Sequence, residues 1–163
     1  MTLNNDVIRE VAAALILVPL TLSMQSAGMA ILIVWQRAYF ARHTFHFGLF
    51  RCGELTVRCT TALLILHTLQ ILLWTAFYRW KCFPDLERAF YFSATSYSTV
   101  GYGDVVLPPN WRLLGPIESI TGVLMCGLSA SLVFALVTRL VGHEDRFESS
   151  RDPAQLTVTE PGV

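Results

Sequence analysis

Charged side chains are scarce in this chain. Of its 163 residues, only 15% are Asp, Glu, Lys or Arg, whereas 53% are hydrophobic. A soluble domain typically carries about 25% charged residues, so the composition argues against a soluble globular protein. The charges that are present balance, with 12 basic and 12 acidic residues. We therefore expect no nucleic acid or other polyanion as a partner.

The cysteines and the potentially catalytic side chains form no pattern that indicates a disulfide, a metal site or an active site. The chain has four cysteines, and none of them forms a CxxC pair: Cys52, Cys59, Cys82 and Cys126. Small apolar or free thiols are therefore expected rather than a disulfide or a metal site. Carboxylates and histidines are scattered among the ends and interiors of apolar runs, without a nucleophile–base or metal-binding constellation. We expect that the chain is not an enzyme.

Three long runs lack any charged residue, namely 11–36, 59–78 and 119–138. A helix needs about 20 predominantly apolar residues to cross the core of a bilayer. The sequence therefore predicts an all-α membrane protein with three transmembrane helices. The second run carries His67, Thr68 and Gln70 near its middle. Because polar groups are costly in hydrocarbon, we expect them to bond to neighbouring helices, with proton sensing by His67 as the less favoured alternative.

The first run, 11–36, has two other interpretations. A voltage sensor needs a row of arginines, which this run lacks. A cleaved signal peptide could end at the small residues 26–30, but residues 1–10 carry no net positive charge and the apolar sequence continues beyond the cleavage site. A retained membrane helix is therefore favoured, and whether residues 1–30 are removed stays open.

A short helix is predicted over residues 85–97. Pro84 is placed to open it, and Asp85 and Glu87 lie in its first turn, where acidic side chains favour the positive end of the helix. This helix is too short to span a bilayer and leads directly into glycine-rich sequence. Irregular backbone at membrane depth is tolerated only where protein buries it or where it lines water, so the pattern predicts a re-entrant loop.

Two glycines alternate with large residues in the string Thr99-Val100-Gly101-Tyr102-Gly103. For consecutive carbonyl oxygens to face one axis, neighbouring residues must take backbone conformations of roughly opposite hand. Only glycine adopts positive φ at little cost, so we expect Gly101 and Gly103 to provide the turns while Val100 and Tyr102 stay in ordinary regions.

With this string, residues 84–140 resemble the pore module of tetrameric potassium channels, which consists of a pore helix, a selectivity filter and an inner helix. The short link after Asp104 is similar to that of small bacterial members, and the first helix is extra. The resemblance implies that K⁺ is the permeant ion and that backbone oxygens of the filter bind it. The implied filter residues are Thr99, Val100, Gly101, Tyr102 and Gly103, with the Thr99 hydroxyl at the innermost site.

The resemblance also assigns supporting roles, and some of the residues that fill them are unusual. Asp104 is placed at the outer mouth. Tyr91 and Phe92 occupy positions where many relatives have paired tryptophans, and Thr95 occupies one where some have a glutamate that braces the mouth. The inner helix of the family bends at a glycine. Gly122 and then Gly127 are the hinge candidates, with small-residue packing as the alternative.

The chain is accordingly divided into four parts: an N-terminal transmembrane helix (1–36), a basic cytoplasmic linker (37–56), the pore domain (57–142) and a flexible cytoplasmic tail (143–163) without a soluble ligand-binding domain. Arginines in the linker and the tail favour the cytoplasmic side for both. We expect a multi-pass plasma-membrane protein with its N-terminus and filter mouth outside, surrounded by lipid and assembled as a homotetramer.

Potassium-selective conduction is the leading functional hypothesis. Two alternatives stay open: a nonselective cation channel, because the filter support is altered, and a non-conducting regulatory membrane subunit. No sequence feature identifies the stimulus that would open the channel.

Overall fold

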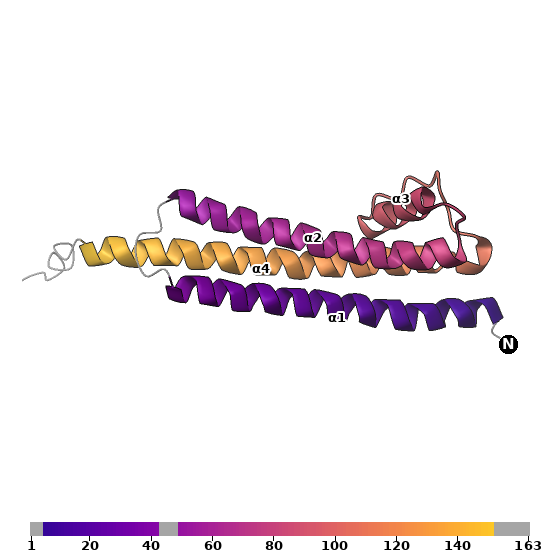
Figure 1. Cartoon of the computed structure of the whole chain (residues 1–163), viewed down its shortest axis with the longest axis horizontal. Helices are drawn as coiled ribbons and strands as arrows, with labels where there is room; N and C mark the ends of the chain where they lie inside the picture. Colours follow the sequence, from indigo (N-terminus) through magenta and orange to yellow (C-terminus); the bar gives the residue numbers. More distant parts are fainter. Residues whose placement is uncertain (1–4, 43–48, 152–163) are drawn as a thin grey trace, which may run out of the picture.

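Three long helices lie side by side in the computed structural model, which describes residues 5–42 and 49–151, with side chains for 5–39 and 53–139. They are α1 (Asn5–Arg42), α2 (Leu49–Lys81) and α4 (Leu114–Arg151). The short helix α3 (Leu86–Tyr97) and the single 3₁₀ turn η1 (Pro109–Trp111) lie at one end of this bundle (Figure 1). The described residues contain no strand, so the expected all-α fold with a re-entrant pore helix is confirmed.

Each long helix is apolar and long enough to cross a membrane. The candidate spans are Asn5–Tyr39, Gly53–Lys81 and Pro109–Arg139, of 35, 29 and 31 residues. They contain the three charge-free runs, and Pro19 lies inside α1 without interrupting it. The chain is therefore a multi-pass membrane protein, as predicted.

The helices are longer than the predicted spans. Because α1 continues to Arg42 and α2 begins at Leu49, most of the segment 37–56 is helical. Likewise, α4 continues to Arg151, so residues 143–151 form helix and not the expected flexible tail. Residues 143–151 contain no proline that would interrupt the helix, and the next proline is Pro153. The residue before a proline is disfavoured in the helical region, so the helix is expected to end near that point. The remainder of the predicted tail, 152–163, and residues 43–48 lie outside the described residues.

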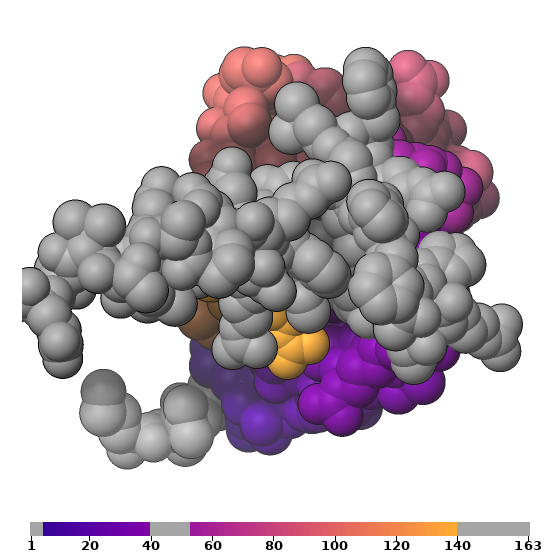
Figure 2. Space-filling model, turned by 90° about the vertical axis from the view of Figure 1, so that its left-hand side faces the viewer, coloured from indigo at the N-terminus to yellow at the C-terminus, as the bar shows by residue number. Residues whose placement is uncertain are grey.

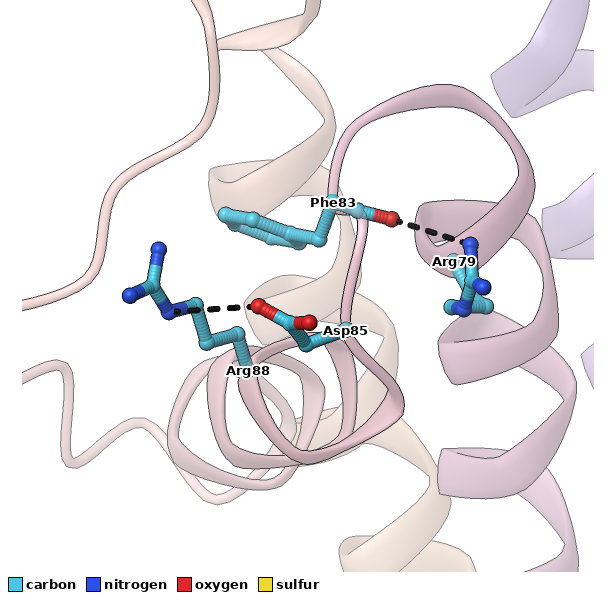
Figure 3. A network of polar contacts seen from close by, with 4 residues as sticks. All are labelled: Arg79, Phe83, Asp85 and Arg88. Carbon is cyan, nitrogen blue, oxygen red and sulfur yellow. Dashed lines mark hydrogen bonds and ion pairs between the residues drawn. The ribbon is translucent and has the colours of Figure 1, made fainter.

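The start of α3 also differs slightly from the prediction. Asp85 is the N-cap, with an extended backbone at φ −113° and ψ 139°, and the first helical residue is Leu86. Pro84 therefore precedes the helix and is not its first residue. Two exposed contacts lie at this turn (Figure 3): Arg79 donates to the Phe83 carbonyl at 3.4 Å, and Arg88 lies 3.7 Å from Asp85. Exposed ion pairs of this kind contribute little stability.

A buried carboxyl group joins three helices beneath the pore helix. Glu118 of α4 is fully buried. One of its oxygens accepts a hydrogen bond from the Tyr78 hydroxyl of α2 at 2.8 Å, and the other accepts one from Ser93 of α3 at 2.5 Å. Around it, Tyr78 packs edge-on against Phe92, with ring centroids 5.1 Å apart. These contacts hold α3 in place against α2 and α4.

The first residues of α1 and the last residues of α4 lie at opposite ends of the bundle. The start of α1 lies at the end that carries α3, and the C-terminal end of α4 lies at the other end (Figure 1). In the perpendicular view, the segment around residue 100 and helix α1 occupy opposite faces of the bundle (Figure 2). The N-terminal end of α1 and the loop after α3 therefore lie at the same end of the bundle, with α1 on the face away from that loop.

We expect Tyr78→Phe to destabilise the fold by about 1–3 kcal/mol, because it leaves a buried oxygen of Glu118 without its donor. The midpoint of thermal unfolding of the purified protein measures this loss. Thr68→Val is the matched control, since the Thr68 hydroxyl bonds only to the Leu64 carbonyl of its own helix. Equal midpoints for the two variants would contradict a structural role for the Glu118 cluster.

Candidate ion pathway

The candidate filter begins where α3 ends. Ser98 is the C-cap of α3, and the two following hydrogen bonds turn the chain back toward the last turn of the helix. The Thr99 amide donates to the Ser96 carbonyl at 3.0 Å, and the Gly101 amide donates to the Thr95 carbonyl at 3.1 Å. The position of the segment therefore depends directly on the C-terminal turn of α3.

Backbone conformations alternate along the candidate filter. Thr99, Gly101 and Gly103 have φ values of 61°, 48° and 79°, whereas Val100 and Tyr102 do not have positive φ. The expectation for the two glycines is confirmed. Thr99 was not foreseen, because a β-branched residue at positive φ is strained and persists only where its surroundings impose it. Extending the alternation one step toward α3 would have identified it.

One face of the filter segment is open in a single chain. All residues from Ser98 to Asp104 are exposed, with Tyr102 73% and Val100 50% exposed. A cavity of about 480 Å³ separates the segment from the start of α4; Thr99, Gly101 and Gly103 line one side, and Gly115 and Ser119 line the other. Lipid cannot satisfy the backbone groups of such a segment, so further protein or water must enclose it.

The mouth residue Asp104 is held by the pore helix. Its carboxylate accepts a hydrogen bond from the Tyr91 hydroxyl at 2.9 Å. This bond raises the pKa of Tyr91 above its ordinary value, because the phenol must keep its proton to donate. Of the three predicted support residues, Tyr91 is the one whose side chain bonds to Asp104.

The other two predicted support residues line the cavity beside the candidate filter and make contacts of a different kind. Phe92 is buried in the core against Tyr78 and Phe83. The Thr95 hydroxyl donates back to the Tyr91 and Phe92 carbonyls of its own helix, at 2.9 and 3.0 Å. From α4, a residue that sequence reasoning missed also binds the helix end: the Ser119 hydroxyl donates to the Ser96 carbonyl at 2.7 Å.

The two hinge candidates have different surroundings. A Cβ atom at Gly122 would lie 2.1 Å from the Tyr97 carbonyl oxygen, so α4 approaches the end of the pore helix where only glycine fits. A Cβ atom at Gly127 would meet no atom within 4 Å. Close packing thus explains Gly122 without invoking a hinge, and bending at either glycine stays a prediction.

We expect Gly122→Ala to displace the end of α3, since the added methyl would overlap backbone and not a mobile side chain. Amide hydrogen exchange of residues 95–103 would rise, and the thermal midpoint would fall. Gly127→Ala, on the same helix but in open space, serves as the control. If the two substitutions have the same effect on exchange, the close approach is not what places Gly122.

A second prediction concerns the bond between Tyr91 and Asp104. Its contribution is complete below the ordinary tyrosine pKa of about 10 and is lost as pH rises through the raised pKa of Tyr91. Subtracting the ultraviolet titration of Tyr91→Phe from that of the wild type isolates Tyr91. In an Asp104→Asn background, the midpoint of the Tyr91 titration would fall toward the ordinary pKa of tyrosine. An unchanged curve would show that the carboxylate does not hold the phenol.

Comparison with known proteins agrees with this geometry. Residues 60–139 match a family model described as an ion channel. Among curated proteins and solved structures, none matches the chain. The matched segment covers most of α2, the pore helix, the candidate filter and the spanning part of α4, and it leaves out α1. Residues 60–139 therefore form a pore domain of the ion channel family, of the two-span potassium-channel type.

Proposed function

We propose that the chain is one subunit of a potassium-selective channel, in which four copies of residues 99–103 line a single pore. The alternation of φ at Thr99, Gly101 and Gly103 carries this proposal. Alternating conformations allow successive carbonyl oxygens to face one axis, where they replace the water shell of K⁺. The Thr99 hydroxyl contributes the innermost site, and repulsion between ions in neighbouring sites lets them leave.

The open face of the filter supports assembly. A single chain supplies one filter strand and leaves it exposed, while a ring of carbonyls around an ion needs several strands. Rotational symmetry with four copies closes the ring with the same surface repeated in each subunit. Membrane lipid surrounds the assembly along the apolar outer faces of the helices.

Charge placement favours cations along the proposed path. The C-terminal end of a helix carries partial negative charge, and the C-terminal end of α3 directly precedes the inner end of the filter. At the other end, Asp104 places a carboxylate beside the mouth. We further propose that the mouth and the N-terminus face the outside of the cell membrane, because the arginine-rich segments lie toward the opposite end.

The test is a reversal potential in liposomes that contain the purified protein under opposed K⁺ and Na⁺ gradients. The proposal predicts a value close to the K⁺ equilibrium potential. A value near zero would make the protein a nonselective cation channel. Absence of any flux that Ba²⁺ blocks, from a homogeneous tetramer, would make it a non-conducting subunit.

Gly101→Ala tests the filter itself. Alanine at positive φ costs about 1–2 kcal/mol in each subunit, so K⁺ flux would fall by more than about tenfold in a tetramer. Gly53→Ala is the matched control, because Gly53 lies in α2 with no atom near its would-be Cβ and without positive φ. Normal flux through Gly101→Ala would contradict the assignment of residues 99–103.

A further inference from the structure

A closed ring of side-chain hydrogen bonds joins all four helices at the C-terminal end of the pore helix. Its members are Gln25 of α1, His67 and Gln70 of α2, Tyr97 of α3 and Ser129 of α4. All of them except the half-buried His67 are buried. The ring lies largely in the membrane-spanning part of the molecule, where an unpaired polar group is costly.

The bonds of the ring follow one another without a break. Gln25 Nε2 donates to Ser129 Oγ at 2.9 Å, and Ser129 Oγ lies 3.0 Å from His67 Nε2. His67 Nδ1 lies 2.8 Å from the Tyr97 hydroxyl, which donates to Gln70 Oε1. Gln70 Nε2 then donates to Gln25 Oε1 at 2.7 Å and closes the ring.

One assignment of protons satisfies every member. With neutral His67 protonated on Nδ1, the imidazole donates to Tyr97 and accepts from Ser129. Each side chain in the ring then donates one bond to the next and accepts one from the previous member. Hydrogen bonds arranged in one direction strengthen one another, so a fully satisfied ring fixes the positions of its members more firmly than isolated pairs do.

The ring reaches the filter through Tyr97. Tyr97 lies two residues before Thr99, and its carbonyl oxygen is packed against Gly122. The neighbouring carbonyls of Thr95 and Ser96 accept the amide hydrogen bonds of Gly101 and Thr99. Displacing the Tyr97 side chain would therefore disturb the turn that imposes positive φ on Thr99.

We propose that Gln25, acting through this ring, is a positioning residue for the filter, so that the helix outside the matched pore domain helps to maintain ion selectivity. The effect on ion selectivity rests on the proposed function as a potassium-selective channel. Helix α1 lies on the face of the bundle away from the filter loop (Figures 1 and 2). Gln25 nevertheless forms hydrogen bonds with Gln70 and Ser129, and Gln70 accepts a hydrogen bond from the Tyr97 hydroxyl.

Packing alone is the competing explanation for α1. Elsewhere along its length, α1 contacts the pore domain through the Trp74 indole, which donates to Thr21 at 3.1 Å, and through Gln36, which donates to the Cys59 sulfur at 3.2 Å. Gln36 is buried, as Gln25 is, but it has no part in the ring. It provides a control of the same residue type on the same helix.

The experiment compares Gln25→Leu with Gln36→Leu in the full chain, reconstituted in lipid. Hydrogen–deuterium exchange of residues 95–103 would be about five- to tenfold faster in Gln25→Leu, as expected for the loss of one or two buried hydrogen bonds, and unchanged in Gln36→Leu. The ratio of Na⁺ to K⁺ permeability would rise in Gln25→Leu alone. Equal exchange in the two variants would overturn the proposal.

Two further variants guard against a failure to fold. Ser129→Ala removes a single oxygen atom from the ring and would also accelerate exchange at the filter, whereas Ser129→Thr retains the hydroxyl and would restore protection. The hydrogen–deuterium exchange of residues 95–103 tests whether Gln25 positions the filter, even if the wild type does not discriminate K⁺ from Na⁺. That result would refute the proposed selectivity but would leave the comparison of Gln25 with Gln36 intact.

Discussion

The backbone of residues 99–104 lacks the hydrogen bonds of a helix or sheet, and the rest of the structure depends on this constraint. Hydrocarbon cannot satisfy such a segment, so protein or water must surround it. The last turn of α3 binds two of its amides, the Tyr91 hydroxyl binds its outer carboxylate, and α4 closes behind the turn at Gly122. The remaining open face is the one that the other subunits of the proposed tetramer would cover.

Within lipid, apolar surface gives little force for holding helices together, because the lipid chains are as apolar as leucine. The helices of this protein instead associate through close approaches and buried hydrogen bonds. The side chain of Leu66 leaves no room for a Cβ at Gly28, and Glu118 accepts bonds from two other helices. No buried side-chain nitrogen or oxygen among the described residues lacks a partner. Polar residues within the spans therefore specify which helix lies beside which.

The sequence predicted those features that depend on local chemistry. Charge-free runs identified the three spans, length identified the re-entrant helix to within a residue, and the alternation of glycines predicted positive φ at Gly101 and Gly103. Helix ends were missed because a charge-free run marks the part that crosses hydrocarbon, not the end of the helix. The sequence named Tyr91 as a support residue but did not pair it with Asp104, because that bond depends on how the loop after the filter folds back onto α3. The partners of Gln25 were missed because they depend on how separate helices are placed. Thr99 combines both cases, since its strain is imposed by the end of α3 and not by its own preference.

The ring of Gln25, His67, Gln70, Tyr97 and Ser129 contains no ion pair, which suits its position in the membrane-spanning part of the bundle. An ion pair at this depth would carry a large desolvation cost, which its attraction repays only with excellent geometry. Amides, hydroxyls and a neutral imidazole avoid that cost, yet each has a defined donor and acceptor. A ring of such groups closes in few arrangements, so it restricts the rotamers of all its members together. Helix α1 presents the glutamine that completes it, while the family model spans residues 60–139 and ends short of α1. A helix on the far face of the bundle can therefore influence the filter without touching it, because the constraint passes through side chains that have one mutually consistent set of bonds.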